Sequence, residues 1–396
     1  MFERTKDLRL SIIKQMELQA AKFPDVISLA QGVPSFDTPS CIKRRVERAL
    51  QDGVVARYSL SPGLPELREL IEIHLAKENM FYDWQEEILI TAGSIEGITA
   101  TILAITNPGD EIIIPEPTYT SYREVIILAG CQPVFVPLKE EKGWTLDTEE
   151  IEKAITPKTK AIFYCNPNNP TGIIYTKEQL LKLGEMAKKH DLFLISDEVY
   201  KDFVFSKDNL FSLAEVTEFR KRVIRLFSFS KTYAMTGWRI GYVHTDREIA
   251  KEILKVHDSL VTCAPVISQY AAMGALEMGE QDIKKFRKKY IERRDIICKR
   301  LDKLRKHFSY TKPNSTYYVF PKINMENFPD SFKKNYKNNE SLSRQFALWI
   351  LEKAQVAVVP GMAFGPSGEG HFRMSFGKRK KEINEAFDRV EKIFQL

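Results

Sequence analysis

Short apolar segments alternate with helical patterns between residues 88 and 243, and this alternation restricts the fold more than any other feature of the sequence. Seven of the apolar segments have the length of a buried strand: 88–91, 111–114, 134–136, 161–165, 192–196, 223–227 and 240–243. Apolar residues recur at helical spacing between several of them, at 95–105, 146–155 and 177–189. Strands that alternate with helices predict an α/β fold, with a mostly parallel seven-stranded sheet flanked by helices.

The pattern changes after about residue 280, where we predict a smaller α+β domain. A long basic helix over 282–307 opens it, and a polar stretch over 324–343 is interpreted as an inserted surface loop. Strands at 356–359 and 371–376 precede a last helix, and the N-terminal segment is expected to join this domain. The predicted division has three parts: residues 1–45 as an N-terminal arm and part of the small domain, 46–280 as the large domain, and 281–396 as the small C-terminal domain.

The charge balance excludes few partners by itself. The chain has 59 basic and 53 acidic residues, a net charge of +6 that suits anionic small molecules and does not require a nucleic acid. Basic and aromatic residues mix in the helix over 282–307, as they do in some nucleic-acid surfaces. Apolar residues recur there at near-helical spacing and acids return at Glu292, Asp295 and Asp302, so we interpret it as a solvated helix face and predict no nucleic-acid partner.

Cysteine usage and the N-terminus bear on location. The five cysteines are scattered and form no Cys-x-x-Cys pattern, which favours free thiols in a reducing compartment. The charged N-terminus has no apolar signal-peptide core, and no apolar run reaches about 18 residues. We therefore expect a cytoplasmic protein without a membrane span, and we assign no metal ligands.

A lysine follows the strand at 223–227 and lies at an edge of the sheet where ligands bind, outside the carboxyl ends of parallel strands. A desolvated lysine has a lowered pKa and attacks carbonyls, including the aldehyde of pyridoxal phosphate (PLP). This lysine is Lys231, with the hydroxyls of Ser228 and Ser230 nearby and Arg239 eight residues on, and these three groups suit a phosphate. By itself, Lys231 could equally be a solvated surface residue.

A PLP site also needs a carboxylate for the pyridine nitrogen and a donor for the ring hydroxyl. Asp197 follows the strand at 192–196, and Tyr200 lies three residues further on. The ionised carboxylate would keep the ring protonated, while the tyrosine would reach the ring hydroxyl. The alternative for Asp197 is an ordinary N-cap of a following helix.

Three further segments supply the remaining groups of such a site. The Pro- and Gly-rich loop 166–172 aims an asparagine amide at the strand ends, although an ordinary turn has the same composition. Free N–H groups at the helix start Gly93-Ser94-Ile95 would bind a phosphate. Tyr119 follows the strand at 111–114 and would stack on the cofactor ring, the alternative being a partly buried loop aromatic.

Arg373 stands alone in the apolar strand at 371–376. Burying an arginine without an anionic partner is costly, and the guanidinium fork fits the carboxylate of a substrate. The alternative is a structural pair with a carboxylate of the protein.

Together these motifs resemble the class I/II aminotransferases of PLP fold type I. The resemblance rests on Asn-Pro-Asn-Asn-Pro-Thr-Gly at 166–172, Ser-Asp-Glu-Val-Tyr at 196–200, Ser-Phe-Ser-Lys at 228–231 with Gly-Trp-Arg-Ile-Gly at 237–241, and Gly-Glu-Gly-His-Phe-Arg at 368–373. It implies that Lys231 forms the Schiff base and moves protons, and that Asp197 pairs with the pyridinium. It implies cofactor contacts from Tyr119, Asn169, Tyr200, Ser228, Arg239 and the backbone of Gly93-Ser94-Ile95, and α-carboxylate contacts from Gly32, Asn169 and Arg373. Tyr58 matches a tyrosine that reaches the phosphate of a neighbouring subunit, which implies a homodimer with shared sites.

The resemblance implies a ping-pong aminotransferase that moves an amino group from an L-amino acid to a 2-oxo acid. In the aspartate-preferring branch a lysine often follows the phosphate turn, where this chain has Ile95, so we expect apolar or aromatic donors such as methionine, phenylalanine, tyrosine, kynurenine or alanine. Ser315 is a second departure, at a position where relatives often have glycine. The alternatives are an aspartate aminotransferase that uses Arg9 or Lys14 instead, a PLP-dependent β-lyase, and, less favoured, a PLP-sensing regulator.

Overall fold

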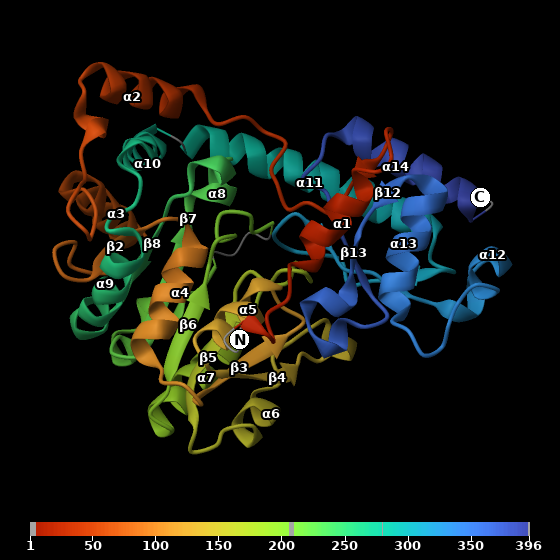
Figure 1. The fold of residues 1–396 in the computed structure, drawn as a ribbon, viewed down its shortest axis with the longest axis horizontal. Coiled ribbons are helices and arrows are strands. Elements are labelled where there is room, and N and C mark those ends of the chain that lie inside the picture. The colour runs from red at the N-terminus through yellow and green to blue at the C-terminus, as the bar shows by residue number, and fades with distance from the viewer. Residues whose placement is uncertain (1–4, 206–209, 279, 395–396) are drawn as a thin grey trace.

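The computed structural model describes residues 5–205, 210–278 and 280–394 (Figure 1). Its largest sheet has seven strands in the order β2-β8-β7-β6-β5-β3-β4. Their bounds are β2 (Ile88–Thr91), β3 (Glu111–Glu116), β4 (Gln132–Pro137), β5 (Thr159–Cys165), β6 (Phe193–Asp197), β7 (Val223–Ser228) and β8 (Gly241–His244). The predicted α/β fold with a seven-stranded sheet is therefore confirmed, and each predicted strand lies within two residues of the observed one at its start or its end.

The sheet is parallel except around one strand. Strands β3 to β7 are parallel to one another, whereas β8 is antiparallel to both β2 and β7. Cys165 pairs with Asp197, and Asp197 pairs with Leu226, so β5, β6 and β7 end at one edge of the sheet. This shared edge brings together loops that are far apart in the sequence.

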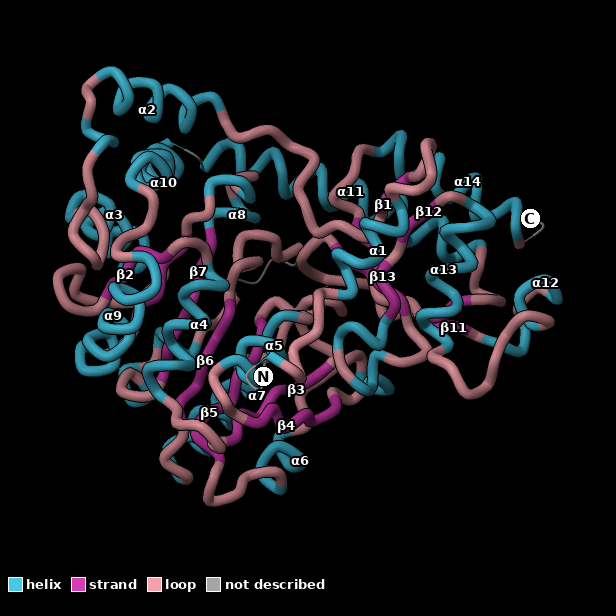
Figure 2. Tube along the Cα trace, in the orientation of Figure 1, coloured by secondary structure: helices cyan, strands magenta, loops and turns pink. Residues whose placement is uncertain are grey.

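Helices flank the sheet, as Figures 1 and 2 show. Those associated with it are α4 (Ser94–Ile105), α5 (Ser121–Leu128), α6 (Thr148–Lys153), α7 (Lys177–Lys189), α8 (Phe229–Thr232) and α9 (Arg247–Val261). Helix α6 is shorter than the predicted 146–155 because Asp147 caps its start by accepting a hydrogen bond from the Glu150 amide. Helices α2 (Ser40–Gln51), α3 (Pro65–Lys77) and α10 (Val266–Met278) pack together beyond the β2 side of the sheet.

The C-terminal part forms smaller sheets, and the N-terminal segment joins them. Strand β1 (Ile27–Ser28) pairs in parallel with β12 (Val356–Ala357), while β14 (Phe372–Ser375) lies between β10 (Tyr318–Val319) and β13 (Val359–Pro360). The strand predicted at 356–359 is thus two strands in different sheets. The remaining elements are α1 (Ile12–Ala20), α11 (Glu280–Lys303), β9 (Phe308–Ser309), β11 (Lys322–Ile323), α13 (Leu342–Ala354) and α14 (Lys380–Ile393). The domain limits near residues 45 and 280 stay a prediction.

The interpretation of residues 324–343 as a surface loop is wrong for their aromatic residues. A short helix, α12 (Asp330–Lys333), forms there, and Phe328 and Phe332 are each only 3% exposed. The Phe332 ring lies 5.3 Å from that of Phe328 and 5.3 Å from that of Trp349. Phe328 lies in extended backbone just before α12 and Phe332 lies within this helix, and both rings reach the core although their neighbours are polar.

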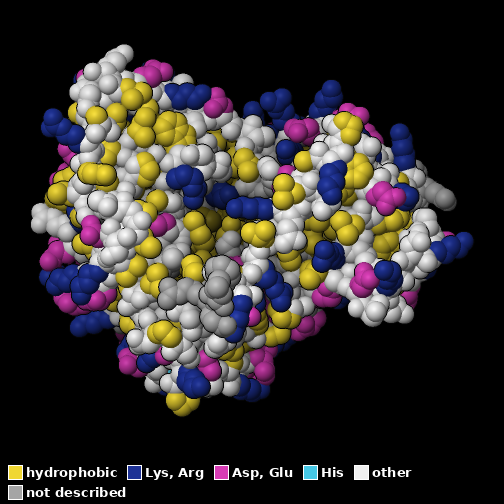
Figure 3. Space-filling view, in the orientation of Figure 1, with side chains coloured by type: hydrophobic (Ala, Val, Ile, Leu, Met, Phe, Trp, Pro, Cys, Tyr) yellow, Lys and Arg dark blue, Asp and Glu magenta, His cyan; other side chains and the backbone are white. Residues whose placement is uncertain are grey.

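Helix α11 has an apolar side that is buried and a charged outer side, as predicted for a solvated helix face. Helix α11 buries Phe286, Tyr290 and Leu301, while Lys284 pairs with Glu280 on its outer side. Basic and acidic side chains are interspersed over the face seen in Figure 3. All five cysteines lie in the described part and none forms a disulfide. In the same residues, no helix combines the length and the apolar character needed to cross a membrane.

Candidate active site

A cavity of about 220 Å³ lies at the shared edge of the sheet, beside the small sheets. Residues from strand ends, from the N-terminal segment and from β14 line it. The predicted site residues in this lining are Gly32, Ser94, Ile95, Tyr119, Asn169, Asp197, Tyr200, Ser228, Ser230, Lys231, Arg239 and Arg373. The fold therefore brings twelve of the predicted positions, drawn from distant parts of the chain, to one cavity.

Lys231 projects into the cavity from the one-turn helix α8. Ser228 caps this helix by accepting a hydrogen bond of 3.2 Å from the Ser230 amide. The Lys231 ammonium donates a 2.9 Å hydrogen bond to the Gly32 carbonyl. Burial and the positive charges of Arg373 and Arg239 lower the pKa of Lys231 to about 8, against a smaller opposing effect of Asp197. About a tenth of the amine is therefore neutral and nucleophilic at pH 7, far more than for an ordinary lysine.

Asp197 is the last residue of β6 and is 4% exposed. Its Oδ2 accepts a 2.6 Å hydrogen bond from the Tyr122 hydroxyl, and its Oδ1 accepts one of 3.3 Å from the Val199 amide. Burial raises the pKa of Asp197 to about 6, although the hydrogen bonds lower it. No helix follows Asp197, so the alternative that it is an ordinary helix cap is wrong.

Tyr122 is a site residue that the sequence prediction missed. It lies in α5, is fully buried and lines the cavity, with its ring 5.4 Å from that of Tyr119 in an edge-to-face arrangement. The one available signal is its position three residues after Tyr119, which places the two rings on one side of a turn. Nothing in the sequence indicates that its hydroxyl reaches Asp197, 75 residues away.

Arg373 is 1% exposed and has no carboxylate partner among the described residues. Its Nη1 donates to the Asn169 side-chain oxygen at 2.9 Å and its Nη2 to the Ala30 carbonyl at 2.6 Å. Within the described structure its buried Nε finds no acceptor. A buried guanidinium held only by neutral groups is unfavourable until an anion binds, which fits a substrate carboxylate. The alternative of a structural pair with a protein carboxylate is not found in this part of the chain.

The sequence prediction also missed Tyr318, the first residue of β10, which lines the cavity beside Arg373, and Tyr317, which precedes it and lies behind the lining. The Tyr318 ring lies 4.2 Å from the Arg373 guanidinium carbon, and its hydroxyl is 3.1 Å from that of Tyr200. Tyr317 donates a 3.0 Å hydrogen bond to the Gly32 carbonyl, which also accepts from Lys231. Their aromatic character predicts burial, and the sequence gives no sign of these partners.

The start of α4 forms a cradle for an anion. Gly93 has a φ of +83°, and a Cβ built on it would lie 2.5 Å from the Arg239 Nη2, so only glycine lets the guanidinium approach. No side chain caps α4, which leaves the first N–H groups of the helix, including those of Ser94 and Ile95, without a side-chain partner. Ser228 and Ser230 line the cavity beside them. A helix N-terminus with a guanidinium and hydroxyls fits a phosphate group.

Tyr58, a predicted site residue, and Ser315, the departure noted in the sequence, both lie outside the cavity lining. Tyr58 is 84% exposed and does not line the cavity, so within one protomer it is not part of the site. Ser315 is fully buried, and its hydroxyl donates a 2.8 Å hydrogen bond to the Gly172 carbonyl. The departure at residue 315 is therefore accommodated beneath the 166–172 loop and does not line the cavity.

The comparisons with known proteins identify the family. The sequence matches the family described as aminotransferase class I and II over residues 24–390. It is 37% identical to an aspartate aminotransferase of Pyrococcus abyssi, with 98% of this chain and 97% of that protein covered. It is 35% identical to aromatic-amino-acid aminotransferase 2 of Thermococcus litoralis, with 98% and 97% covered. The solved structure of the aspartate aminotransferase from Thermus thermophilus with maleate superposes with a TM-score of 0.90, at 31% identity and with 99% of each chain covered. The predicted resemblance is thus confirmed: the chain belongs to the class I and II aminotransferase family and is an enzyme that transfers amino groups by PLP-dependent chemistry.

Proposed function

We propose that this enzyme moves the amino group of an apolar or aromatic L-amino acid to a 2-oxo acid such as 2-oxoglutarate, with PLP bound in the cavity described above. One observation carries the proposal. Lys231, Asp197 and Arg373 face one cavity, as an amine with a lowered pKa, a buried carboxylate and a guanidinium without an anionic partner. These are the groups that an amino acid and a pyridine aldehyde need.

The residues that we propose for cofactor binding form two groups, one for the ring and one for the phosphate. Asp197 would pair with the protonated pyridine nitrogen, Tyr200 and Asn169 would reach the ring hydroxyl, and Tyr119 would stack on the ring. The phosphate would be held by the backbone of Gly93-Ser94-Ile95 together with Ser228, Ser230 and Arg239. When bound, PLP supplies an aldehyde that condenses with amines and a protonated ring that withdraws electrons from the substrate α-carbon.

The side chains of this protein then bind the substrate and move its proton. Arg373, with Asn169 and the Gly32 backbone, would hold the α-carboxylate and turn the α-carbon toward Lys231. Lys231 would take the proton from that carbon and return it, because a group with a pKa of about 8 serves well as both base and acid near neutral pH. The partner of the amine in this structure is the neutral Gly32 carbonyl. The amine therefore has to break one hydrogen bond, and no ion pair, when it acts.

The lining of the cavity supports an apolar side chain on the donor. Ile13, Ile95 and Ile98 all line it, and its only cationic lining residues among those described are Lys231, Arg239 and Arg373, which the roles above already use. A second carboxylate on the substrate would therefore lose a charge partner, at a cost of about 1–3 kcal/mol or more.

An aspartate-preferring enzyme is the second candidate, and one observation favours it. Arg9 lines a neighbouring cavity of about 340 Å³ that shares Tyr119 with the active-site cavity. A shift of the N-terminal segment would bring this guanidinium toward the substrate. Lys14, the other basic residue considered, lines neither of these two cavities.

We also propose a cytoplasmic homodimer. Exposed apolar side chains lie near Tyr58 in the sequence: Val54 is 43% exposed, Leu60 is 63% and Leu50 is 51%. Figure 3 shows hydrophobic side chains gathered at the upper left, where α2 and α10 lie. A partner that covers this face would bring Tyr58 to its own cofactor phosphate. Sedimentation tests the dimer, and Tyr58→Phe should weaken PLP retention; a fully active monomer would contradict the proposal.

A donor panel decides the substrate class. We expect kcat/KM with 2-oxoglutarate or pyruvate as acceptor to be higher for methionine, phenylalanine, tyrosine, kynurenine or alanine than for aspartate. A roughly tenfold preference for aspartate over every apolar donor would overturn the argument from Ile95 and leave the aminotransferase intact. Stoichiometric release of ammonia from the donor would favour the β-lyase alternative.

A further inference from the structure

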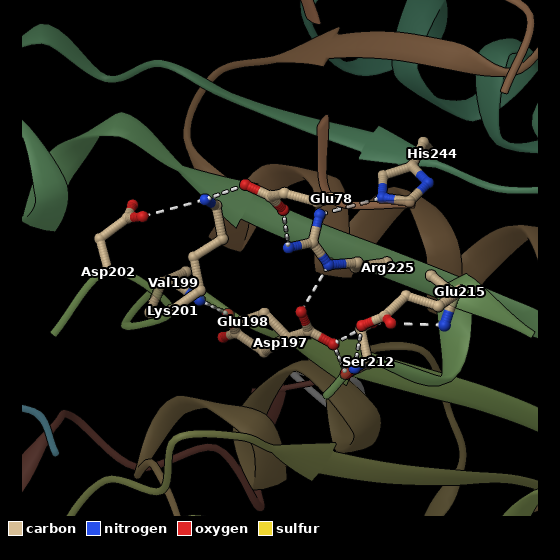
Figure 4. Close-up of polar contacts among 12 residues, drawn as sticks. Glu78, Asp197, Glu198, Val199, Lys201, Asp202, Ser212, Glu215, Arg225 and His244 are labelled. Carbon is tan, nitrogen blue, oxygen red and sulfur yellow. Dashed lines mark hydrogen bonds and ion pairs between the residues drawn. The ribbon is translucent and has the colours of Figure 1, made fainter. Parts of the chain in front are cut away.

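A chain of charged side chains begins next to Asp197 (Figure 4), and its members do not line the active-site cavity. We call it the ion network, and its members are Glu198, Arg225, Glu78, Lys201 and Asp202. Arg225 and Glu198 are each 1% exposed and pair at 2.5 Å, and Arg225 also lies 3.5 Å from Glu78. Lys201 joins Glu78 at 2.5 Å to Asp202 at 3.0 Å. All five line a separate cavity of about 250 Å³ that shares no lining residue with the active-site cavity.

Both ends of the ion network reach the backbone that holds the catalytic groups. Glu198 directly follows Asp197, and its Oε1 accepts hydrogen bonds from Ser196 at 2.9 Å and Ser212 at 2.7 Å. At the other end, Asp202 Oδ2 accepts a 2.8 Å hydrogen bond from the Thr232 hydroxyl. Thr232 is fully buried and directly follows Lys231. The network therefore connects the segment that carries Asp197 with the helix that carries Lys231.

Helix α8 needs such support because it is only four residues long. One helical turn has too few internal hydrogen bonds to be stable by itself. Ser228 caps its N-terminal end, and the hydrogen bond from Thr232 to Asp202 holds its C-terminal end. Lys231 must release the Gly32 carbonyl to act, so its side chain has to move while its backbone stays in place.

We propose that Asp202, held by Lys201, is a positioning residue that fixes α8 through Thr232 and so sets the position of the Lys231 amine. The proposal rests on the role of Lys231 in the function proposed above. The carboxylates of Asp202 and Glu78 outweigh the effect of burial and raise the pKa of Lys201, which therefore stays charged and keeps Asp202 in place. No member of the network lines the active-site cavity, so its effect passes through the backbone of α8.

A purely structural ion network is the alternative, and stability alone does not separate the two. Breaking a buried pair by removing one partner is destabilising whatever else the pair does. A positioning role predicts in addition that the environment of the Lys231 amine changes. The readouts are therefore kcat and KM separately, and the pH midpoint of the visible absorption of the PLP-loaded enzyme, which reports the state of the cofactor at Lys231.

The test uses Thr232→Val in the holoenzyme, because valine keeps the shape of threonine and removes the donor to Asp202. We expect kcat to fall about tenfold or more with KM nearly unchanged, since a misplaced catalytic group lowers the rate more than binding. The absorption midpoint should shift by about half a pH unit or more. Thr232→Ser keeps the hydroxyl and should restore most of the lost rate, and Asp202→Asn should fall between the two.

Thr245→Val is the matched control. Thr245 is also fully buried, and its hydroxyl donates at 2.8 Å to the Val223 carbonyl at the opposite end of β7. We expect both valine variants to lower the melting temperature, and only Thr232→Val to change kcat and the absorption midpoint. If Thr232→Val changes only the melting temperature, the network is structural and the proposal is wrong. If instead Lys231→Ala keeps near wild-type turnover, the proposed function itself fails, and the two failures are thereby distinguished.

Discussion

The Tyr318 hydroxyl fills the space that a side chain on residue 32 would need. A Cβ built on Gly32 would lie 1.8 Å from the Tyr318 hydroxyl oxygen and 3.0 Å from the ring carbon that bears it. The same hydroxyl lies 3.1 Å from that of Tyr200, and the Tyr318 ring lies against Arg373. The absence of a side chain at residue 32 thus allows one tyrosine to contact the proposed carboxylate-binding and ring-binding groups together.

Gly32→Ala should therefore damage the site even though it adds only one methyl group. Either the backbone of residue 32 or the ring of Tyr318 must move, and we expect kcat/KM to fall by about tenfold to a hundredfold because positioning of both substrate ends is disturbed. Tyr318→Phe removes the closest atom of the clash. The double variant should recover part of the loss in a double-mutant cycle, and purely additive effects of the two substitutions would contradict this relationship.

Tyr122→Phe should move the pH dependence of cofactor binding. The pKa of Asp197 is raised to about 6, so below pH 6 the carboxyl is protonated and cannot pair with a pyridinium, whereas above pH 6 it is ionised. PLP affinity of the apoenzyme should therefore rise with pH through about 6 and then level off. The Tyr122 hydrogen bond lowers this pKa, so its loss should shift the midpoint to higher pH.

Equilibrium dialysis of PLP between pH 5 and 8 measures that midpoint. Asp197→Asn has no titrating carboxyl at this position, so its remaining pH dependence reports the ionisation of PLP and of Lys231 and serves as the correction. An unchanged midpoint in Tyr122→Phe would mean that this hydrogen bond has no influence on the carboxyl.

Capture of PLP by the apoenzyme should accelerate as the pH rises through about 8. Below that pKa most of the Lys231 side chain is an ammonium ion and is not a nucleophile, and above it the neutral amine dominates. Each pH unit below 8 should slow capture by about tenfold. Stopped-flow absorbance follows the rate, and borohydride reduction followed by peptide mapping locates the lysine. Lys231→Ala should show neither covalent capture nor turnover, and near wild-type turnover in that variant would disprove the assignment.

Ile95→Lys should increase activity toward acidic donors. The new ammonium would line the same cavity as Ile13 and supply a charge partner for a second carboxylate. We expect kcat/KM for aspartate to rise about tenfold or more relative to phenylalanine. Ile95→Met is the uncharged control and should leave this ratio nearly unchanged. If lysine and methionine at residue 95 give the same ratio, the substrate side chain does not approach this position.

The sequence predicts the residues whose place follows from strand ends. Asp197 directly follows an apolar run, Lys231 lies four residues after the end of another, and Gly93 marks a strand-to-helix turn, so a parallel sheet brings all three to one edge. The reversed direction of β8 could not be predicted in this way, because its apolar pattern is the same for either direction.

Residues that act through distant partners were not predicted. Tyr122 lies on a helix face whose pattern indicates only burial, and the hydroxyl of Tyr318 meets that of Tyr200 across 118 residues of sequence. The pair of Arg225 with Glu198 could not be predicted either. An arginine inside a buried strand indicates that an anionic partner exists, but the sequence does not show which residue it is. Periodicity describes which face a residue occupies, whereas these contacts depend on which elements the topology brings together.

The hydrogen bond from Arg373 to the Ala30 carbonyl spans 343 residues and has a consequence for how the site assembles. The proposed phosphate and ring contacts, from Gly93 to Arg239, are all synthesised before the last third of the chain. The carboxylate end needs Gly32 beside β14, and β1 reaches that region by pairing with β12. Such long-range closure is slow to form and is the last part available to a growing chain. In a nascent chain, the residues that bind the cofactor are therefore complete well before those that bind the amino acid.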